Sequence, residues 1–264
     1  MMTDCSIGIV TYNNARTIEN TLRALIQNWP TDLSGHVFIV DNGSTDDTLS
    51  IIEALIQAQP SLPVSLIRSA SGNCGYGAGH NQVIPELESR IHIIMNPDIV
   101  IHDGNSLLAM VRRLDQEPSI GLVMPKIIDP EGRTQYLARR DLTVLDLLLR
   151  YLPGSWNTRR EAYHTMRDKD YDQPFDVEFA SGCLMAMRTA DFRAIGGFDP
   201  RYFLYAEDAD ISRTVRAKGW RILYDPAAVV EHAWERGSYK SPKMFLIHFR
   251  SLWTYFRKWG FRFL

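Results

Sequence analysis

Three acidic residues, Glu207, Asp208 and Asp210, lie within four positions at the predicted start of a helix, directly after an aromatic-rich segment. Like charges this close together need a cation, a substrate or the positive end of a helix dipole to stabilise them. The plain alternative is a helix with an acidic first turn. A further acid, Asp98, ends the segment Asn96-Pro97-Asp98 after an apolar run. Together these acids favour an active site that handles a metal ion and a phosphate group.

These side chains suit two chemical tasks. A carboxylate within hydrogen-bond reach of a hydroxyl can act as a general base, and Asp208 and Glu207 are the candidates. The oxygens of Asp98 suit Mg²⁺ or Mn²⁺, which also bridge the oxygens of a diphosphate. His232 would add an imidazole ligand and shift the preference toward Mn²⁺, although a lone histidine is more often structural or exposed. For Asp210 the alternatives are support of these side chains or a helix cap.

Polar segments follow each of four predicted strands in the first half of the chain. They are Thr11-Tyr12-Asn13, Asp41-Asn42-Gly43, residues 71–76 and Asn96-Pro97-Asp98. The carboxyl ends of parallel strands meet at one edge of a sheet, where open α/β sheets bind ligands. We therefore expect a nucleotide site there, the alternative being that loops are polar in any case. Asp41 can accept a hydrogen bond from a base or a ribose hydroxyl, or simply close an Asx-turn.

Three glycines occupy alternate positions, at Gly75, Gly77 and Gly79, before a predicted helix. Glycine permits close backbone approach, and a helix N-terminus favours phosphate. The segment is not a Walker A loop, because no Gly-Lys-Ser/Thr follows, and it lacks the dinucleotide-binding G-x-G-x-x-G spacing. The missing fingerprint argues against a Rossmann-type oxidoreductase.

The elements that position these residues alternate between strand and helix. Strands are predicted at residues 5–11, 36–40, 64–67, 91–95 and 120–127, and helices at 15–28, from Ser44 or Thr45, from about 78, and at 105–116. This alternation predicts an α/β fold with a mainly parallel sheet covered on both faces. Later in the chain we expect one strand within 179–188, a helix ending near 218, and two strands at 220–224 and 228–232.

Composition narrows the class of protein. The 264 residues are 45% hydrophobic and carry a formal net charge of −2, which provides no global basic field for nucleic acid. Three widely spaced cysteines suggest no disulfide framework and favour a reducing compartment. We expect no signal peptide and no transmembrane helix. The predicted organisation is a catalytic domain over residues 1–235, with a variable insertion or lid at 129–175, followed by a C-terminal segment at 236–264.

The C-terminal segment mixes basic and aromatic residues and contains no acidic residue after residue 235. Aromatic and aliphatic side chains recur there every three to four positions, which predicts a basic amphipathic helix. Such a helix can lie on an anionic membrane surface or pack against the core, and the sequence leaves both alternatives open.

The motifs, taken in their order along the chain, resemble family 2 glycosyltransferases, and are most similar to bacterial rhamnosyltransferases of polysaccharide and O-antigen synthesis. The motifs are Thr11-Tyr12-Asn13, Asp41-Asn42-Gly43-Ser44-Thr45-Asp46, residues 73–81, Asn96-Pro97-Asp98, Ser181-Gly182-Cys183, Gly196-Gly197-Phe198-Asp199 and Glu207-Asp208-Ala209-Asp210. The resemblance is weakest over residues 129–175. It implies the GT-A fold, which is Rossmann-like, and an inverting transferase.

The resemblance also implies roles for individual residues. The nucleotide-sugar would be bound by Thr11, Tyr12, Asn13, Asp41, Gly75, Asn81, Asn96 and Asp98. Asp208 would be the base, with Glu207 the less favoured choice, and Asp98 and His232 would hold Mn²⁺ or Mg²⁺. Many members of the family carry Asp-x-Asp where this chain has Asn96-Pro97-Asp98, so this site has one carboxylate fewer.

From the resemblance we expect dTDP-L-rhamnose as donor and a saccharide on a polyprenyl diphosphate as acceptor. The expected location is the cytoplasm, with peripheral contact to the inner face of the membrane through the C-terminal helix. One alternative is a transferase that uses a UDP-sugar carrying GlcNAc, galactose or galactofuranose. A less favoured alternative is a catalytically silent protein that binds sugar nucleotides.

Overall fold

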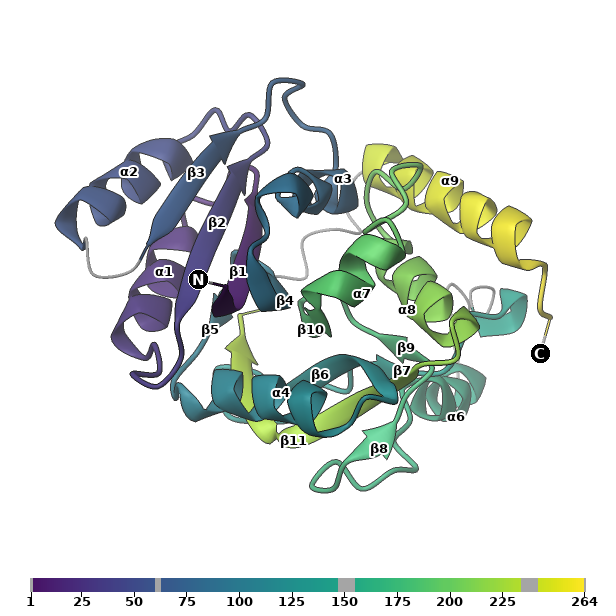
Figure 1. Cartoon of the computed structure of the whole chain (residues 1–264). Coiled ribbons are helices and arrows are strands. Elements are labelled where there is room, and N and C mark those ends of the chain that lie inside the picture. Colours follow the sequence, from purple (N-terminus) through teal and green to yellow (C-terminus); the bar gives the residue numbers. More distant parts are fainter. Residues whose placement is uncertain (1, 60–62, 147–154, 234–241, 264) are drawn as a thin grey trace.

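The computed structural model describes residues 2–59, 63–146, 155–233 and 242–263 (Figure 1). In these ranges the chain forms a nine-stranded mixed sheet with the order β3-β2-β1-β4-β10-β6-β11-β5, and β8 pairs with β11. The strands of this sheet are β1 (Thr3–Thr11), β2 (Gly35–Asp41), β3 (Val64–Arg68), β4 (Ser89–Met95), β5 (Ile99–Val100), β6 (Ile120–Ile128), β8 (Phe175–Asp176), β10 (Leu184–Arg188) and β11 (Arg221–His232). Two short strands, β7 (Ala138–Arg139) and β9 (Phe179–Ala180), form a separate pair.

Helices cover both faces of the sheet (Figure 1). They are α1 (Ile18–Gln27), α2 (Thr48–Ala58), α3 (Tyr76–Asn81), α4 (Asn105–Gln116), α6 (Ser155–His164), α7 (Thr189–Ala194), α8 (Glu207–Ala217) and α9 (Pro242–Trp259), with a short 3-10 turn at Ile84–Glu86. None of the helices in the described part of the chain is both long and apolar enough to cross a membrane. Residues 236–241 of the predicted C-terminal segment, and 147–154 of the predicted insertion, lie outside the described residues.

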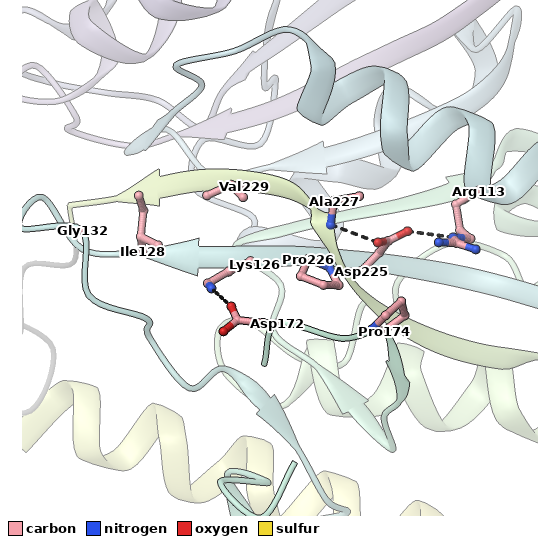
Figure 2. Close-up of a pocket in the computed structure, with 10 residues that line it drawn as sticks. All are labelled: Arg113, Lys126, Ile128, Gly132, Asp172, Pro174, Asp225, Pro226, Ala227 and Val229. Atoms are coloured by element: carbon pink, nitrogen blue, oxygen red, sulfur yellow. Dashed lines mark hydrogen bonds and ion pairs between the residues drawn. The ribbon is translucent and has the colours of Figure 1, made fainter. Parts of the chain in front are cut away.

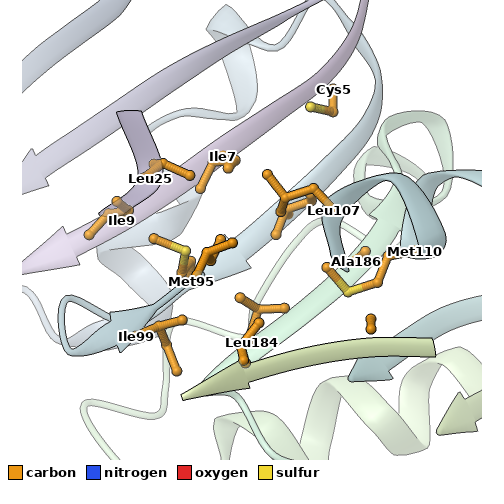
Figure 3. Close-up of a cluster of buried hydrophobic side chains, with 14 of the residues drawn as sticks. Cys5, Ile7, Ile9, Leu25, Met95, Ile99, Leu107, Met110, Leu184 and Ala186 are labelled. Atoms are coloured by element: carbon orange, nitrogen blue, oxygen red, sulfur yellow. The ribbon is translucent and has the colours of Figure 1, made fainter. Parts of the chain in front are cut away.

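The core is divided by the sheet. One buried cluster joins the sheet to α1, α2 and α4, and Figure 3 shows Leu25 and Leu107 packed toward Ile7 and Ile9 of β1. A second cluster on the opposite face joins the sheet to α7 and α8. Because each fully buried aliphatic side chain contributes about 1.5–3 kcal/mol, this two-sided burial is the main reason the strands stay together.

The first four long strands run parallel. β1 pairs in parallel with β2 and β4, and β2 pairs in parallel with β3. The register places Thr11 opposite Asp41, so both strand ends lie at one edge. The predicted α/β fold with a largely parallel sheet is confirmed. The four polar segments predicted to share an edge therefore do so.

Three predictions about element boundaries were wrong. The predicted strand within residues 179–188 is two strands, β9 and β10, and β10 runs antiparallel between β4 and β6. The predicted strands 220–224 and 228–232 are one strand, β11, whose pairing register shifts between Asp225 and Val229, around Pro226. Proline lacks the N–H that a regular ladder needs, so it interrupts the strand locally without ending it.

The third error concerns the start of α2. Neither Ser44 nor Thr45 caps this helix, which begins at Thr48. The Asp46 carboxylate instead accepts hydrogen bonds from the Thr48 amide at 3.1 Å and its hydroxyl at 2.5 Å. Because of this Asx-type turn at Asp46, the helix begins about one helical turn later than predicted.

Candidate active site

The loops after β1 and β2 are bound to each other at the carboxyl edge of the sheet. Asn13 has a left-handed backbone with φ of 56°. Its amide donates to Ser44 Oγ at 3.0 Å, and its side-chain oxygen accepts from the Thr45 amide at 2.8 Å. Thr11 is fully buried beside it, whereas Tyr12 is 45% exposed. The loop therefore presents Tyr12 outward from a fixed backbone.

Asp41 closes an Asx-turn and also keeps one oxygen unpaired. Its Oδ2 accepts from the amides of Gly43 and Ser44, both at 3.0 Å. Its Oδ1 is buried and has no hydrogen-bond partner within the described chain. Because an unpaired buried oxygen is costly, this atom is suited to accept a hydrogen bond from a ligand at the sheet edge.

The glycine-rich segment holds a distant loop against the sheet edge. Gly75 has φ of 94°, and a Cβ there would lie 2.2 Å from the carbonyl oxygen of Phe203. Only glycine allows this approach. The next residue, Tyr76, donates its amide to the same Phe203 oxygen at 3.0 Å. The backbone of this segment thus fixes the loop before α8 at Phe203.

Asn81 has a structural contact that differs from its predicted contact with the donor. Its side-chain oxygen accepts from the Phe198 amide at 2.9 Å, and its side-chain nitrogen donates to the Phe198 carbonyl at 2.7 Å. The one side chain satisfies both main-chain groups of Phe198. The structure therefore assigns the Asn81 amide to fixing the loop that leads to α8.

Asp98 and His232 come together although 134 positions separate them in the sequence. His232 Nε2 lies 3.3 Å from Asp98 Oδ2. The other ring nitrogen, Nδ1, lies 3.4 Å from Gln135 Oε1, and Gln135 Nε2 donates to the His232 carbonyl at 2.8 Å. Gln135 thereby orients the ring so that Nε2 faces Asp98, as outer-shell residues do for histidine ligands.

This pair fits a divalent cation in two respects. Asp98 Oδ1 is buried without a hydrogen-bond partner, and carboxylate oxygen with imidazole nitrogen suits Mn²⁺. Among the described residues no three His, Cys, Asp or Glu side chains form a metal cluster. The described residues would therefore supply two ligands at this position, with substrate oxygens and water available for the remaining coordination.

The segment between β9 and β10 connects these groups to the acids of α8. The Gly182 amide donates to Asp208 Oδ2 at 3.2 Å, and the Gly182 carbonyl accepts from the Tyr76 hydroxyl at 2.7 Å. The next carbonyl, of Cys183, accepts from the Asn96 amide at 2.8 Å. Residues 182–183 thus join the strand end at Asn96 to the start of α8.

Helix α8 begins from a strained backbone. Tyr205 and Ala206 both have left-handed φ angles, 69° and 64°, although neither is glycine. Such a conformation costs about 1–3 kcal/mol for each residue and clusters at functional sites. In the first turn of the helix that follows, Asp208 reaches the Gly182 amide at 3.2 Å.

The two acids have different surroundings. Glu207 is 6% exposed, and its Oε2 has no hydrogen-bond partner in the described chain. Burial, and then the charge of Asp208, raises the pKa of Glu207 well above its usual range. Asp208 is half-buried, and its oxygens accept from the amides of Gly182 and Ala209.

Burial also raises the pKa of Asp208, but Arg139 and those backbone amides oppose the rise. Hydrogen bonds to a carboxylate favour its charged form. The geometry therefore favours a neutral Glu207 beside an ionised Asp208. When the pKa values of two neighbouring acids differ in this way, the ionised acid can abstract a proton from a substrate.

Asp210 points away from these acids. Its carboxylate accepts from Trp259 Nε1 at 2.7 Å, from Lys258 Nζ at 2.8 Å and from the Tyr202 hydroxyl at 3.1 Å. Of the two alternatives for Asp210, the structure favours support: it binds α9 to α8 and to the loop before it.

Three residues near the site were missed by the sequence reasoning. Gln135 orients His232, the Tyr76 hydroxyl binds Gly182, and the charge of Arg139 opposes the rise in the pKa of Asp208. Tyr76 lies inside the glycine-rich segment and could have been considered there. Gln135 and Arg139 lie in the stretch without motifs and carry no local signal.

A separate cavity of about 640 Å³ lies against β6 and β11 (Figure 2). None of the predicted site residues lines it. Its charged side chains are already paired, Arg113 with Asp225 at 2.7 Å and Lys126 with Asp172 at 2.6 Å. The candidate active site is therefore the polar edge described above and not this cavity.

The chain is similar in sequence to one protein family and to individual members of it, and similar in fold to solved structures. The profile of the family described as "Glycosyl transferase family 2" matches residues 6–196. Over 246 residues the chain is 30% identical to a Mycobacterium tuberculosis protein named N-acetylglucosaminyl-diphospho-decaprenol L-rhamnosyltransferase, covering 88% of this chain and 76% of that protein. It is also 25% identical over 193 residues to Rhamnosyltransferase WbbL of Escherichia coli strain K12, covering 68% of this chain and 70% of that protein.

Solved structures show the same fold at lower identity. The structure of GalNAc-T7 with UDP, GalNAc and Mn²⁺ superposes with a TM-score of 0.72 at 17% identity, over 97% of this chain. The Pyrobaculum calidifontis mannosyltransferase PcManGT with GDP-Man and Mn²⁺ gives 0.64 at 20% identity, over 90% of this chain. This chain spans about half of the first structure, 48%, and 59% of the second.

Proposed function

Because this chain belongs to glycosyl transferase family 2, and is therefore a glycosyltransferase with the predicted GT-A fold, we propose that it transfers L-rhamnose from dTDP-L-rhamnose. The proposed acceptor is a saccharide carried on a polyprenyl diphosphate, in the synthesis of a cell-surface polysaccharide. The observation that carries this choice is the 30% identity to the M. tuberculosis rhamnosyltransferase, whose name specifies a decaprenol-linked acceptor.

We assign the nucleotide end of the donor to the loops after β1 and β2. The unpaired Asp41 Oδ1 would accept a hydrogen bond from the base or a ribose hydroxyl. This bond would supply the partner that the buried oxygen lacks. Tyr12, held outward by the fixed backbone of Asn13, would cover the same end. The buried Thr11 would shape the pocket floor.

The diphosphate end is assigned to the edge beyond β4. Asp98 and His232 would hold Mn²⁺ or Mg²⁺, which when bound would offset the negative charge of the departing nucleotide diphosphate. Gln135 keeps His232 Nε2 directed at this position. The half-buried Asn96 lies at the same strand end, where its side-chain amide would donate to a donor oxygen.

Asp208 is the proposed general base. The acceptor hydroxyl would lose its proton to the Asp208 carboxylate while its oxygen forms a bond to the anomeric carbon. The bond from that carbon to the diphosphate oxygen breaks on the opposite side, which inverts the anomeric configuration. Glu207 remains protonated and leaves Asp208 as the ionised member of the pair.

The experiment is product formation by the purified protein with Mn²⁺, a short polyprenyl-diphosphate-linked GlcNAc acceptor, and a panel of dTDP-, UDP- and GDP-sugars. We expect a disaccharide product only with dTDP-rhamnose, and thermal stabilisation of the protein by the same donor. A product with a UDP-sugar instead would keep the enzyme class and overturn the rhamnose assignment. Donor binding with neither transfer nor hydrolysis would support the catalytically silent alternative.

A further inference from the structure

Helix α9 has a buried face that binds the loop before α8. Leu252, Tyr255 and Phe256 pack against residues of that loop and of α8. The Ser251 hydroxyl donates to the Leu204 carbonyl at 2.8 Å, and Lys258 binds Asp210. These contacts fix how α9 is oriented and which of its faces points to solvent.

The solvent-facing side of α9 carries an apolar stripe, formed by three large side chains. Leu246, Phe249 and Trp253 recur at helical spacing and are 55%, 57% and 51% exposed. The exposed large hydrophobic side chains of the described chain are Met2, Tyr12, Tyr136, Tyr163, Phe203, Phe245, Leu246, Phe249, Trp253, Phe261 and Phe263. Six of these eleven lie between residues 245 and 263, so the exposure is concentrated and not scattered.

Positive charge borders this apolar stripe. Arg250 and Arg257 follow Leu246 and Trp253 by four positions, so each lies one turn further along the same side. Together with Lys243 they form no ion pair with any described residue. Residues 242–263 contain no acidic side chain at all.

We propose that this face of α9 docks on the surface of a bilayer that contains anionic lipid. Aromatic and leucine side chains of the stripe enter the boundary between headgroups and acyl chains, while the flanking cations bind lipid phosphates. A second copy of the chain is the less suitable occupant, because self-association through this stripe would bring Arg250 and Arg257 close to like charges. The inference goes beyond the proposed reaction and depends on neither its donor nor its acceptor.

Docking through α9 would place the catalytic loop near the membrane. The buried face of α9 holds residues 202–206, and Glu207 and Asp208 follow directly. In Figure 1, α9 lies along the outer side of the molecule beside α8. An acceptor anchored in the same bilayer would thus approach from the side on which the base is held.

The experiment is co-sedimentation of the whole protein with vesicles of phosphatidylcholine, with and without phosphatidylglycerol, at low and high salt. We expect binding only to the anionic vesicles, weakened by salt. The pair Arg250→Glu and Arg257→Glu should lower vesicle affinity by about twentyfold or more, since each basic residue near an anionic surface changes partitioning several-fold. The pair Phe249→Ser and Trp253→Ser should lower it independently of salt.

Matched controls replace an exposed arginine and an exposed aromatic residue elsewhere on the surface. Arg112→Glu on α4 and Tyr163→Ser on α6 should leave vesicle binding unchanged. All variants should keep the wild-type thermal stability and the wild-type response to donor, which separates docking from the proposed reaction. The proposal is overturned if the wild-type protein does not bind anionic vesicles. It is also overturned if the variant with Phe249→Ser and Trp253→Ser binds them as tightly as the wild type does. A concentration-dependent dimer abolished by Phe249→Ser and Trp253→Ser would assign this face to a second copy instead.

Discussion

Replacing Glu207 by glutamine tests whether this acid is held neutral beside Asp208. The buried Oε2 of Glu207 has no partner in the described chain, and burial raises the pKa of its carboxyl group. A raised acid pKa means that the folded state binds the proton more tightly than the unfolded state does. Its stabilising contribution is therefore complete below the ordinary value of 4.5 and is lost as the pH rises toward the raised value.

The magnitude follows from proton linkage. Between those two pH values the wild type loses up to about 1.4 kcal/mol of unfolding free energy per pH unit through this one proton, whereas the variant has no such proton to lose. The glutamine amide has two N–H donors where the protonated acid has one O–H, so one more donor is left unpaired, which costs about 1–3 kcal/mol at every pH. The free energy of unfolding of Glu207→Gln should thus be equal to or below that of the wild type near pH 5, and above it near pH 8.

The assay is urea unfolding of both proteins at several pH values from 5 to 8, together with transfer rates at each pH. The difference in unfolding free energy should grow steadily in favour of the variant, and the transfer rate should stay within about tenfold of wild type, because Asp208 remains. Parallel stability curves across this range would refute the raised pKa of Glu207. If Glu207→Gln lost as much turnover as an Asp208 variant, the assignment of Asp208 and not Glu207 as the base would be refuted.

Four other perturbations test the remaining site residues and the contact that holds α9. Asp208→Asn should lower the transfer rate by about a hundredfold or more with donor binding retained, as seen by calorimetry, and near-wild-type turnover would remove Asp208 as the base. Chelation should abolish turnover, and Gln135→Leu should weaken apparent Mn²⁺ affinity by about 10- to 100-fold in a metal titration, since Gln135 orients the imidazole of His232; an unchanged titration would contradict that role. Lys258→Met should cost about 3 kcal/mol of unfolding free energy by leaving the Asp210 carboxylate buried without its cation, whereas the exposed Lys218→Met should cost nothing measurable in the same denaturation experiment.

Much of the fold was predictable because it depends on short-range patterns. The alternation of apolar strands with amphipathic helices predicted the parallel half of the sheet, and α4 begins and ends where its periodicity indicated, at Asn105 and Gln116. The polar segments at strand ends predicted the ligand edge, since parallel strands place their carboxyl ends together whatever surrounds them. The acids at 207–210 marked the start of α8.

The errors arose where a distant partner overrides the local pattern. The run at 179–188 is continuous in residue type, but β10 pairs antiparallel with β4 while residues 181–183 turn aside to bind Asn96 and Asp208. Pro226 resembles a strand break, but pairing with β6 on both sides keeps β11 whole. Tertiary hydrogen bonding outweighs local propensity in both places.

The sequence by itself determined which residue types stand at the carboxyl edge of the sheet, because strand periodicity and polar strand ends are properties of neighbouring positions. Only the tertiary structure decided how each side chain is used. Asn81 binds Phe198 across 117 positions, and Gln135 binds His232 across 97. Asp210 likewise binds Lys258 on α9 instead of the site. Contacts of this kind depend on how the elements pack in space, and no local pattern in the chain records them.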